Sequence, residues 1–145
     1  MEIYTIGFTK KTAAQFFGAL KNASIEQLVD VRLNNVSQLA GFAKRDDLEF
    51  FLSEICSATY KHEPLLAPTQ DLLDDYKKKK GSWDVYEKQF LSLLNERQVE
   101  KRISRNLFSK RTVLLCSEST AEQCHRRLVV EYLQSEWGPI SVKHL

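Results

Sequence analysis

The sequence predicts an α/β protein with a mostly parallel sheet of about five strands and helices on both faces. Short apolar runs rich in β-branched residues alternate along the chain with longer segments whose apolar residues recur every three or four positions. No internal repeat and no Pro/Gly/Ser-rich linker divides the 145 residues. A single domain over residues 1–145 is therefore expected, since single domains commonly hold about 100–200 residues.

Five segments read as strands, because each is a short apolar run that stops at polar or charged residues. The third is ended by its proline, Pro64, which cannot donate a backbone hydrogen bond to a neighbouring strand. The five are Glu2–Phe8, Gln27–Arg32, Thr59–Leu65, Arg111–Glu118 and Ile140–Leu145.

The segments between the strands read as helices. Residues 9–23 and 45–58 carry helical stripes, and Asp71–Lys80 is expected to be a helix closed by Gly81. Ser82 can cap the next helix, and the spacing predicts that helical structure continues through Leu107. A last helix is expected from Ala121 to about Glu136. The apolar seam of the two middle segments comprises Trp83, Tyr86, Phe90, Leu94, Val99, Ile103 and Leu107.

Composition indicates a soluble globular protein, with 43% hydrophobic and 28% charged residues. A net charge of +2 is too small to indicate wholesale nucleic-acid binding. No apolar stretch approaches the roughly 20 residues that span a bilayer, so no membrane association is expected. The start of the chain lacks the pattern of a secretory signal, and three cysteines are an odd number. A cytoplasmic protein with three free thiols is expected.

Three of the predicted strands end in unusual chemistry, at Thr5–Phe8, Asp30–Arg32 and Cys116–Glu118. In open α/β sheets, ligands bind beyond the carboxyl ends of the strands, near a switch point in strand order. If the three strands are parallel neighbours, their ends meet at one edge of the sheet. Thr5 and Gly7 are therefore expected to contribute to a ligand site there.

The turn after the fourth strand has a helix-start signal. Ser119-x-x-Glu122 fits a capping box, whose exposed N–H groups attract anions. Arg126 or Arg127 could add guanidinium donors, so an anion site is expected near Thr120. The alternative is a well-capped helix with a Glu122–Arg126 pair one turn apart.

Cys116 has two interpretations. It could be a nucleophile activated by the helix N-terminus and a nearby arginine, or a buried residue that ends an apolar strand. The Cys-x5-Arg loop of thiol phosphatases is absent, because Arg126 comes ten positions later. Cys124 is expected in the core, on the Ala121, Leu128 and Tyr132 face of its helix.

Cys116, Glu118, Cys124 and His125 are residue types that bind metals, and His62 is a further candidate ligand. Zinc sites usually pair cysteines two to four residues apart, a spacing that is absent here. Neighbouring Cys124 and His125 on a helix would point about 100° apart, so one ion could not easily bind both. No metal and no cofactor are expected.

Asp30 and Arg32 flank Val31, and strand alternation places both on one face of the sheet. Charges at the end of a buried strand are costly unless they are paired. An Asp30–Arg126 or Arg32–Glu118 ion pair would meet that demand. A site in which Asp30 is a base and Arg32 holds an anion would meet it as well.

A basic stretch follows the central helix and could contact a phosphate backbone together with Lys77–Lys80. Such runs are usually solvated helix faces. Its members are Arg97, Lys101, Arg102, Arg105, Lys110 and Arg111.

Motifs in order along the chain resemble a bacterial and archaeal family known as domain of unknown function 488. They read "YTIGF", "DVRLNNVSQLAGF", "HEPLL", "CSE" and "CHR". The family usually has His or a similar polar residue where this chain has Phe8. A proline is common where this chain has Asn35, and a glycine corresponds to Ala67. The resemblance implies that the polar strand ends form a ligand site, and it leaves the reaction open.

Two functions are consistent with these residues. One is an enzyme acting on a phosphate-bearing ligand, such as a nucleotide or a nucleic-acid end. Arg32 and Arg126 would hold the anion, Glu118 or Asp30 would move protons, and Cys116 would be nucleophile or wall, with Cys124 and His125 beside the ligand. The other is a non-catalytic nucleotide or nucleic-acid binding module that uses the same pocket.

Overall fold

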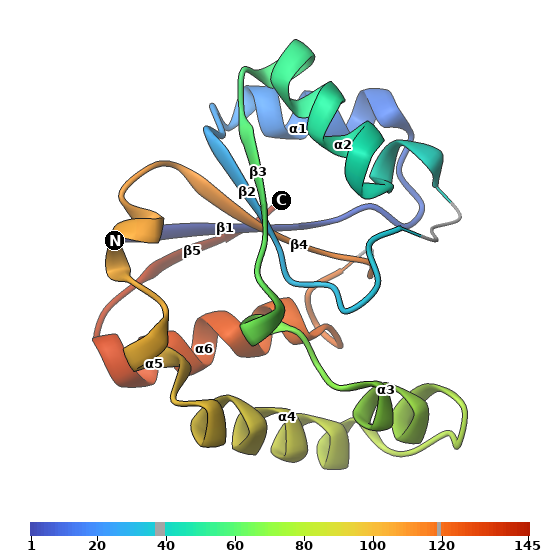
Figure 1. Ribbon diagram of the computed structural model, residues 1–145, viewed down its shortest axis with the longest axis vertical. Coiled ribbons are helices and arrows are strands. Elements are labelled where there is room, and N and C mark those ends of the chain that lie inside the picture. Colours follow the sequence, from blue (N-terminus) through green and yellow to red (C-terminus); the bar gives the residue numbers. More distant parts are fainter. Residues whose placement is uncertain (37–39, 119) are drawn as a thin grey trace.

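A computed structural model of the chain describes residues 1–36, 40–118 and 120–145. It contains a five-stranded parallel sheet in the order β3-β2-β4-β1-β5, with helices on both faces (Figure 1). The predicted α/β class, the number of strands and their parallel pairing are confirmed. The strands are β1 Glu2–Gly7, β2 Gln27–Asp30, β3 Thr59–His62, β4 Thr112–Cys116 and β5 Ser141–His144.

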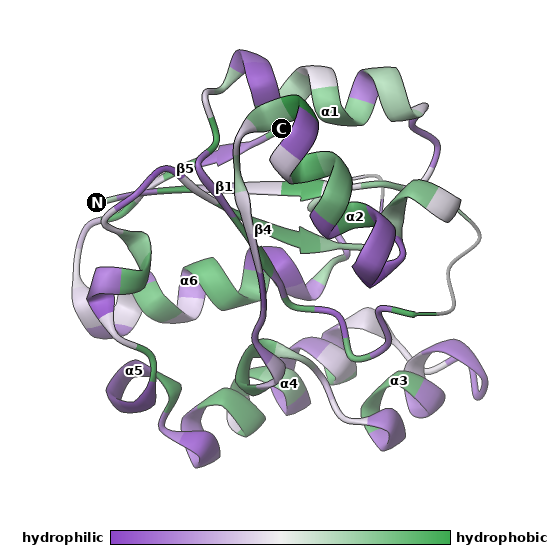
Figure 2. Cartoon of the chain, turned by 45° about the horizontal axis from the view of Figure 1, so that its top comes forward, coloured by the Kyte–Doolittle hydropathy of each residue, from purple (hydrophilic) through white to green (hydrophobic). Residues whose placement is uncertain are grey.

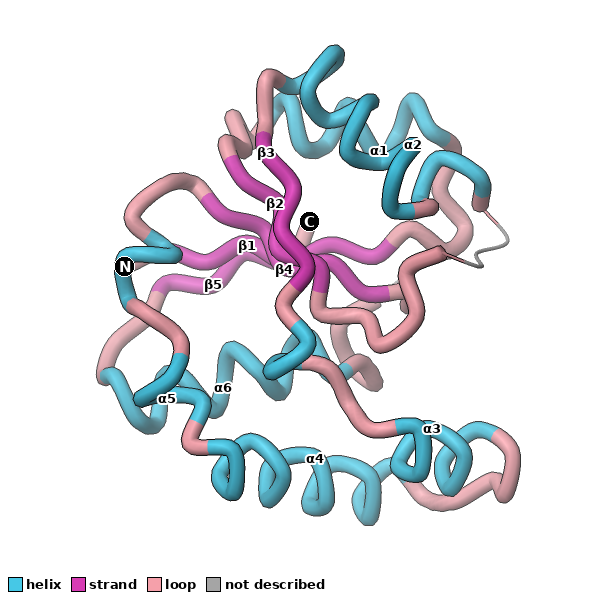
Figure 3. Tube along the Cα trace, in the orientation of Figure 1, coloured by secondary structure: helices cyan, strands magenta, loops and turns pink. Residues whose placement is uncertain are grey.

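The helices lie in two layers, which Figure 3 shows in cyan on either side of the magenta sheet. One layer holds α1 (Ala13–Asn22), α2 (Arg45–Phe51) and the π-helical turn Leu52–Cys56 that continues it. The opposite layer holds α3 (Gln70–Lys77), α4 (Trp83–Arg97), α5 (Val99–Arg102) and α6 (His125–Trp137). Short 3-10 helices lie at Gly41–Ala43, Pro64–Leu66 and Arg105–Phe108.

Strand alternation divides the core in two. In β4, Val113 and Leu115 pack in the α1/α2 layer, whereas Leu114 and Cys116 pack in the α4/α6 layer. All five residues of β4 are buried, as expected for a central strand of a parallel sheet, and Figure 2 colours this strand mostly green. Cys116 therefore faces α6 and not α1, which decides the neighbours of its sulfur.

Two helix starts match their sequence signals. Thr12 forms a capping box with Gln15 at the start of α1, and the Ser82 hydroxyl accepts a hydrogen bond from the Val85 N–H at the start of α4. Helical structure continues towards Leu107, but in separate short pieces, α5 and the 3-10 helix Arg105–Phe108. Gln98 takes a left-handed conformation, φ 52°, and separates α4 from the four-residue α5.

The start of the last helix also differs from the prediction. α6 begins at His125 with Cys124 as an extended N-cap, φ −138° and ψ 139°, not at Ala121. Ser119, the predicted cap, lies outside the described residues. Residues 120–124 form turns, so Glu122 is not on the helix and the predicted Glu122–Arg126 pair along a helical face is not formed.

The strand order places a switch point between β1 and β4. The chain leaves β1 towards β2 on one side, and it leaves β4 towards β5 on the other. Connections that depart in opposite directions leave a crevice beyond the carboxyl ends of the two strands, which is the usual position of a ligand in this architecture. Gly7 and Cys116 are direct neighbours at that point. Within the described residues, no helix has the length and apolar character needed to cross a membrane.

Candidate functional site

The three polar strand ends meet at one edge of the sheet, which confirms the prediction about their arrangement. Gly7 is in register with Cys116, and Asp30 is in register with Leu115, the residue before Cys116. The Val31 N–H donates to the Leu115 carbonyl at 3.0 Å and continues the alignment past the end of β2. The site is thus assembled from three segments that are distant in the sequence.

Asp30 is paired with Arg32, not with Arg126. Arg32 donates from Nε at 2.8 Å and from Nη2 at 2.7 Å to the two carboxylate oxygens, and its own backbone N–H donates to Oδ1 at 3.1 Å. The Tyr60 hydroxyl donates to Oδ2 at 2.6 Å. Asp30 is fully buried, and both of its oxygens accept two hydrogen bonds each. The predicted alternatives, Asp30–Arg126 and Arg32–Glu118, are wrong because this pair forms within three residues of one chain segment.

Tyr60 is a site residue that the sequence analysis missed. It lies on β3, two residues before His62, so both side chains are on one face of the strand next to β2. Its hydroxyl also accepts from Asn35 at 2.9 Å. Burial and the hydrogen bond to the Asp30 carboxylate raise the pKa of Tyr60, so the phenol stays protonated and donates. The signal was the i, i+2 spacing to His62, which becomes informative only once β3 is known to lie beside β2.

Two histidines hold the backbone around Arg32. His62 Nε2 donates to the Arg32 carbonyl, and His125 Nε2 donates to the Val31 carbonyl, each at 2.7 Å. Burial lowers the pKa of His125 to about 4, so this imidazole is neutral at pH 7. Because a carbonyl only accepts, the proton of neutral His125 is on Nε2 and Nδ1 carries a lone pair. The ring also stacks on Phe90, with centroids 5.4 Å apart.

Arg126 is the second buried arginine of the site, with 1% of its surface exposed. Its Nη1 donates to the Glu118 carbonyl at 2.6 Å, and its Nε donates to the Thr5 hydroxyl at 3.3 Å. The same Nη1 lies 3.6 Å from the sulfur of Cys116 and 3.8 Å from that of Cys124. Burial lowers its pKa to about 10. The guanidinium remains charged at neutral pH.

Thr5 and Gly7 position this arginine. The Thr5 hydroxyl is buried and contacts His144 Nδ1 at 2.5 Å, so it is shared between His144 and Arg126. A Cβ added at Gly7 would lie 1.5 Å from the Glu118 carbonyl oxygen and 2.6 Å from Arg126 Nη1. Only glycine lets the Cys116–Glu118 turn cross so close to the end of β1.

Cys116 and Cys124 form a disulfide. The prediction that all three cysteines are free thiols is therefore wrong, and Cys56 is the free one among the described residues. The free-thiol prediction assumed that Cys124 lies within a helix, whereas α6 begins one residue later, at His125. With Cys124 as an extended N-cap and not a helical residue, its side chain reaches back to the end of β4. Cys124 is nevertheless buried, as predicted, with 2% of its surface exposed.

The same change removes the argument against shared metal ligation. The ligand atoms of Cys116, Cys124 and His125 lie within 4.8 Å of one another. The expected angle of about 100° between two successive helical residues does not apply, because Cys124 precedes the helix. These three residues are the ones that could hold a metal among those described. The sulfurs could do so only as thiolates, after reduction of the disulfide.

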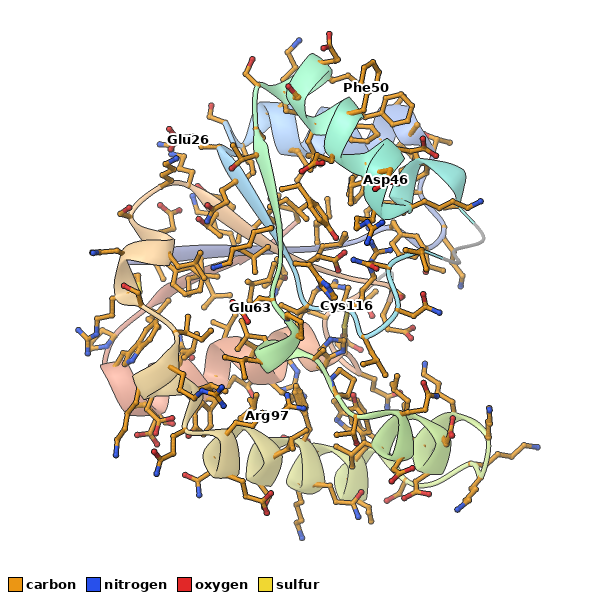
Figure 4. The ribbon with its side chains drawn as sticks, viewed as in Figure 1. Glu26, Asp46, Phe50, Glu63, Arg97 and Cys116 are labelled. Atoms are coloured by element: carbon orange, nitrogen blue, oxygen red, sulfur yellow. A yellow bond between two sulfur atoms is a disulfide. The ribbon has the colours of Figure 1, made fainter. Side chains whose placement is uncertain are left out.

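A cavity of about 170 Å³ opens beside these residues. Figure 4 shows Cys116 on the side of the sheet that faces the lower helical layer, where the cavity lies. One wall is aromatic: Trp83 stacks on Tyr86 with centroids 5.3 Å apart, and Tyr76 contacts both rings. The polar lining comprises Arg32, Asn34, Lys77, Ser117, Glu118, Gln123, Cys116, Cys124 and His125.

Arg32, which lines this cavity, carries a donor group without a hydrogen-bond partner among the described residues. The side chain is 2% exposed, and its guanidinium lies against the Phe8 ring at 5.4 Å from the centroid. Nε and Nη2 are bound to Asp30, but Nη1 is buried and has no hydrogen-bond partner among the described residues. Phe8, the departure from the usual histidine, thus supplies a flat surface for the arginine.

Glu118 lies at the mouth of the cavity and pairs with Lys77, at 2.7 Å between Nζ and Oε1. Both side chains are about half exposed. Its backbone carbonyl, and not its carboxylate, is the group that binds Arg126. Glu118 and Lys77 are therefore accessible from solvent, whereas Asp30, Arg32 and Arg126 are not.

Much of the predicted basic stretch is used within the fold. Arg97 Nη1 donates to the carbonyls of Leu65 and Ala67 at 2.9 and 2.7 Å, and Figure 4 shows it between α4 and the chain above. Arg105 lies over the Trp137 ring. In the lysine run, Lys78 and Lys79 pair with aspartates one turn earlier on α3. The other basic residues of the stretch, Lys101, Arg102, Lys110 and Arg111, are exposed.

The sequence model of the family described as Domain of unknown function DUF488 matches residues 12–133. The chain belongs to this family. The matched range contains Asp30, Arg32, Cys116 and the Cys124–Arg126 segment, and it excludes β1 and β5. No curated protein and no solved structure matches the chain.

Proposed function

We propose that this member of the DUF488 family binds a small phosphate-bearing ligand, a nucleotide or a nucleic-acid end, in the cavity beyond β4. The observation that carries the proposal is the buried, unpartnered Nη1 of Arg32, a residue that lines the cavity. The ligand's phosphate accepts from this group, and its apolar or aromatic part rests on the Trp83 and Tyr86 rings.

The energetics of Arg32 support a ligand. A buried polar group without a hydrogen bond costs about 1–3 kcal/mol, and more when it is charged. Asp30 and Phe8 hold the guanidinium in place, so ligand binding costs little side-chain entropy at Arg32. A phosphate oxygen at Nη1 would form a charge-assisted hydrogen bond, which is stronger than a neutral one.

The size of the cavity decides which ligands fit. Pockets that enclose a drug-sized molecule measure roughly 300–1,000 Å³, whereas this one measures about 170 Å³. A terminal phosphate with part of a nucleoside fits, and a dinucleotide cofactor does not. The remainder of a longer ligand would extend past Lys77 and Glu118 into solvent.

A binding role is favoured over catalysis because two of the candidate catalytic groups, Asp30 and Cys116, are already engaged in other contacts. Asp30 accepts four hydrogen bonds and has no free lone pair directed at a ligand, so its role is to position Arg32. Cys116 is no nucleophile while it is bonded to Cys124. If the protein turns its ligand over, Glu118 is the carboxylate of the cavity that can move a proton.

Tryptophan fluorescence tests the proposal directly, because the chain has two tryptophans and one lines the cavity. In a Trp137→Phe background, Trp83 is the sole indole. We expect inorganic phosphate and nucleoside monophosphates to change its emission in a saturable way, and the corresponding nucleosides to bind at least tenfold more weakly. A Trp83→Phe protein, which keeps Trp137, should give no signal.

Arg32→Lys sharpens the test. Lysine cannot bind Asp30 through two nitrogens and also reach the cavity, so we expect at least a tenfold loss of phosphate affinity in a protein that still folds by circular dichroism. Arg45→Lys, at an exposed arginine, is the matched control and should bind as the parent does. Equal affinity for nucleoside and nucleotide, or no saturable change with any probe at millimolar concentration, would refute the proposal.

A further inference from the structure

We propose that Cys116 and Cys124 are a redox-active pair: small thiols that enter the cavity reduce their disulfide, and Cys124 is then held as a thiolate. This activity is separate from the ligand binding proposed above and does not rest on it. It concerns the sulfur wall of the cavity and the arginine behind that wall.

Access to the pair is through the cavity. Cys116 and Cys124 are 1% and 2% exposed, yet both line the cavity. A reagent of a few heavy atoms can reach the sulfurs through a space of about 170 Å³, whereas a protein thiol on a folded partner cannot. The substrate class is therefore a low-molecular-weight thiol, or a small disulfide in the reverse direction.

Among the described residues, Arg126 has no ion-pair partner in the oxidised state. Its hydrogen-bond acceptors are a carbonyl, a hydroxyl and two sulfurs, and the nearby Glu118 carboxylate is bound to Lys77. A buried charge is costly unless it is paired. Reduction would supply the missing charge, because a thiolate on either cysteine would lie about where its sulfur now contacts Nη1, at 3.6 or 3.8 Å.

The helix start decides which sulfur keeps the charge. Cys124 is the N-cap of the thirteen-residue α6, and no side chain in the described part of the chain caps this helix end. Thiolates at helix N-termini and beside arginine are stabilised by several pH units in the strongest cases. Cys116 instead ends a fully buried strand, among apolar side chains. Cys124 is thus the better leaving group in thiol exchange.

The reaction with a dithiol such as dithiothreitol balances in two steps. A reagent thiolate attacks the Cys116 sulfur, the bond between the two cysteines breaks, and Cys124 leaves as a thiolate. The second reagent thiol then loses its proton and attacks the reagent sulfur bound to Cys116, which releases Cys116 as a thiol after protonation. Two electrons pass to the protein, and the reagent leaves as a cyclic disulfide.

The first experiment counts reactive thiols in the folded protein. A Cys56→Ser protein retains only the two cysteines of the pair. It is treated with dithiothreitol without denaturant, then alkylated and weighed by mass spectrometry. We expect no alkylated cysteine before reduction and two after it. A pair that resists reduction until the protein is unfolded is structural, and that outcome would overturn the proposal.

The second experiment measures the thiolate. In Cys56→Ser, Cys116→Ser, only Cys124 remains, and its alkylation rate is followed against pH. We expect the midpoint at least one unit below the value of about 8.5 for an ordinary cysteine. Adding Arg126→Met should move it upwards by about one unit, a tenfold loss of thiolate at neutral pH, and Arg126→Lys should restore part of it. An ordinary midpoint in the parent variant would contradict the proposal even if Arg126→Met fails to fold.

A third measurement separates exchange from metal binding. The reduced Cys56→Ser protein is incubated with zinc, dialysed against a chelator and analysed for metal. We expect no zinc to be retained. One zinc per chain would show that the pair serves with His125 as a metal site, and it would overturn thiol exchange. None of these measurements contains a phosphate ligand, so they can fail or succeed independently of the cavity's proposed ligand.

Discussion

The end of β2 and the start of α6 each bury an arginine, and the two arginines are satisfied in opposite ways. Arg32 has its charge balanced by Asp30 but leaves one donor group without a partner. Arg126 has its donors bound to a carbonyl, a hydroxyl and sulfur, but none of the described carboxylates forms an ion pair with it. An unused donor suits a hydrogen-bonding ligand, and an unbalanced charge suits a nearby thiolate.

This contrast shows that burial alone does not tell what a buried cation does. Both side chains are at most 2% exposed, and both lie at the carboxyl edge of the same sheet. The difference lies in the main hydrogen-bond acceptor of each guanidinium. Arg32 donates to a carboxylate two residues away, whereas Arg126 donates to a backbone carbonyl of a tight turn.

The largest effect is expected from Asp30→Asn, which leaves Arg32 buried without its counter-charge. Removing one member of a buried ion pair costs about 3–5 kcal/mol, so we expect a loss of that order in the free energy of unfolding, measured with urea. Asp46→Asn is the matched control, because the Arg45–Asp46 pair is exposed, and it should change stability by less than about 1 kcal/mol. Equal losses of stability in the two variants would show that the buried Asp30–Arg32 pair stabilises the fold no more than an exposed pair does.

The next effect concerns His125, which joins the two regions because it precedes Arg126 and binds the Val31 carbonyl. Its pKa is lowered to about 4 in the folded protein, against about 6.5 when unfolded. The unfolded chain therefore binds the proton more tightly. The stability from neutral His125 is complete above about pH 6.5 and declines as pH falls towards 4.

One pKa unit corresponds to about 1.4 kcal/mol, so up to roughly 3 kcal/mol should be lost over that range. Urea unfolding between pH 7 and 4 measures it, and His125→Gln should flatten this part of the profile. A His125→Gln protein with the parent's full pH dependence would assign the effect to other groups.

A smaller effect is expected from Gly7→Ala. The new methyl group would meet the Glu118 carbonyl and Arg126, so the turn must shift. Overpacking of this kind typically costs about 1–3 kcal/mol, and thermal unfolding should show it. Gly18→Ala, in α1 with open space around its Cβ, should instead stabilise by roughly 0.5–1 kcal/mol. Arg32 should keep its ligand affinity in Gly7→Ala if the two regions are independent.

The smallest effect on stability is expected from Lys77→Gln. The Lys77–Glu118 pair is about half exposed on both sides, so its loss should cost less than about 1 kcal/mol. Phosphate affinity should fall more clearly, because a cation is removed from the mouth of the cavity. Unchanged phosphate affinity would show that Lys77 does not contribute to phosphate binding and that Arg32 is the cation that does.

Residue patterns alone were enough to predict the class of fold, the five strands and the meeting of three polar strand ends. Period-2 and period-3.6 patterns are local, and the carboxyl ends of parallel strands share an edge once the strands are neighbours. Asp30, Arg32, Cys116 and Arg126 could therefore be assigned to one place before any coordinates were known.

The side-chain contacts at the site depend on how distant segments pack, so residue spacing could not predict them. Tyr60 binds Asp30 because β3 lies beside β2, and Gly7 matters because the Glu118 carbonyl crosses it, contacts that no local pattern encodes. The disulfide was missed because a shift of four residues in the start of α6, from Ala121 to His125, turns Cys124 towards β4. Helix boundaries depend on competing contacts at their ends, which residue spacing does not reveal.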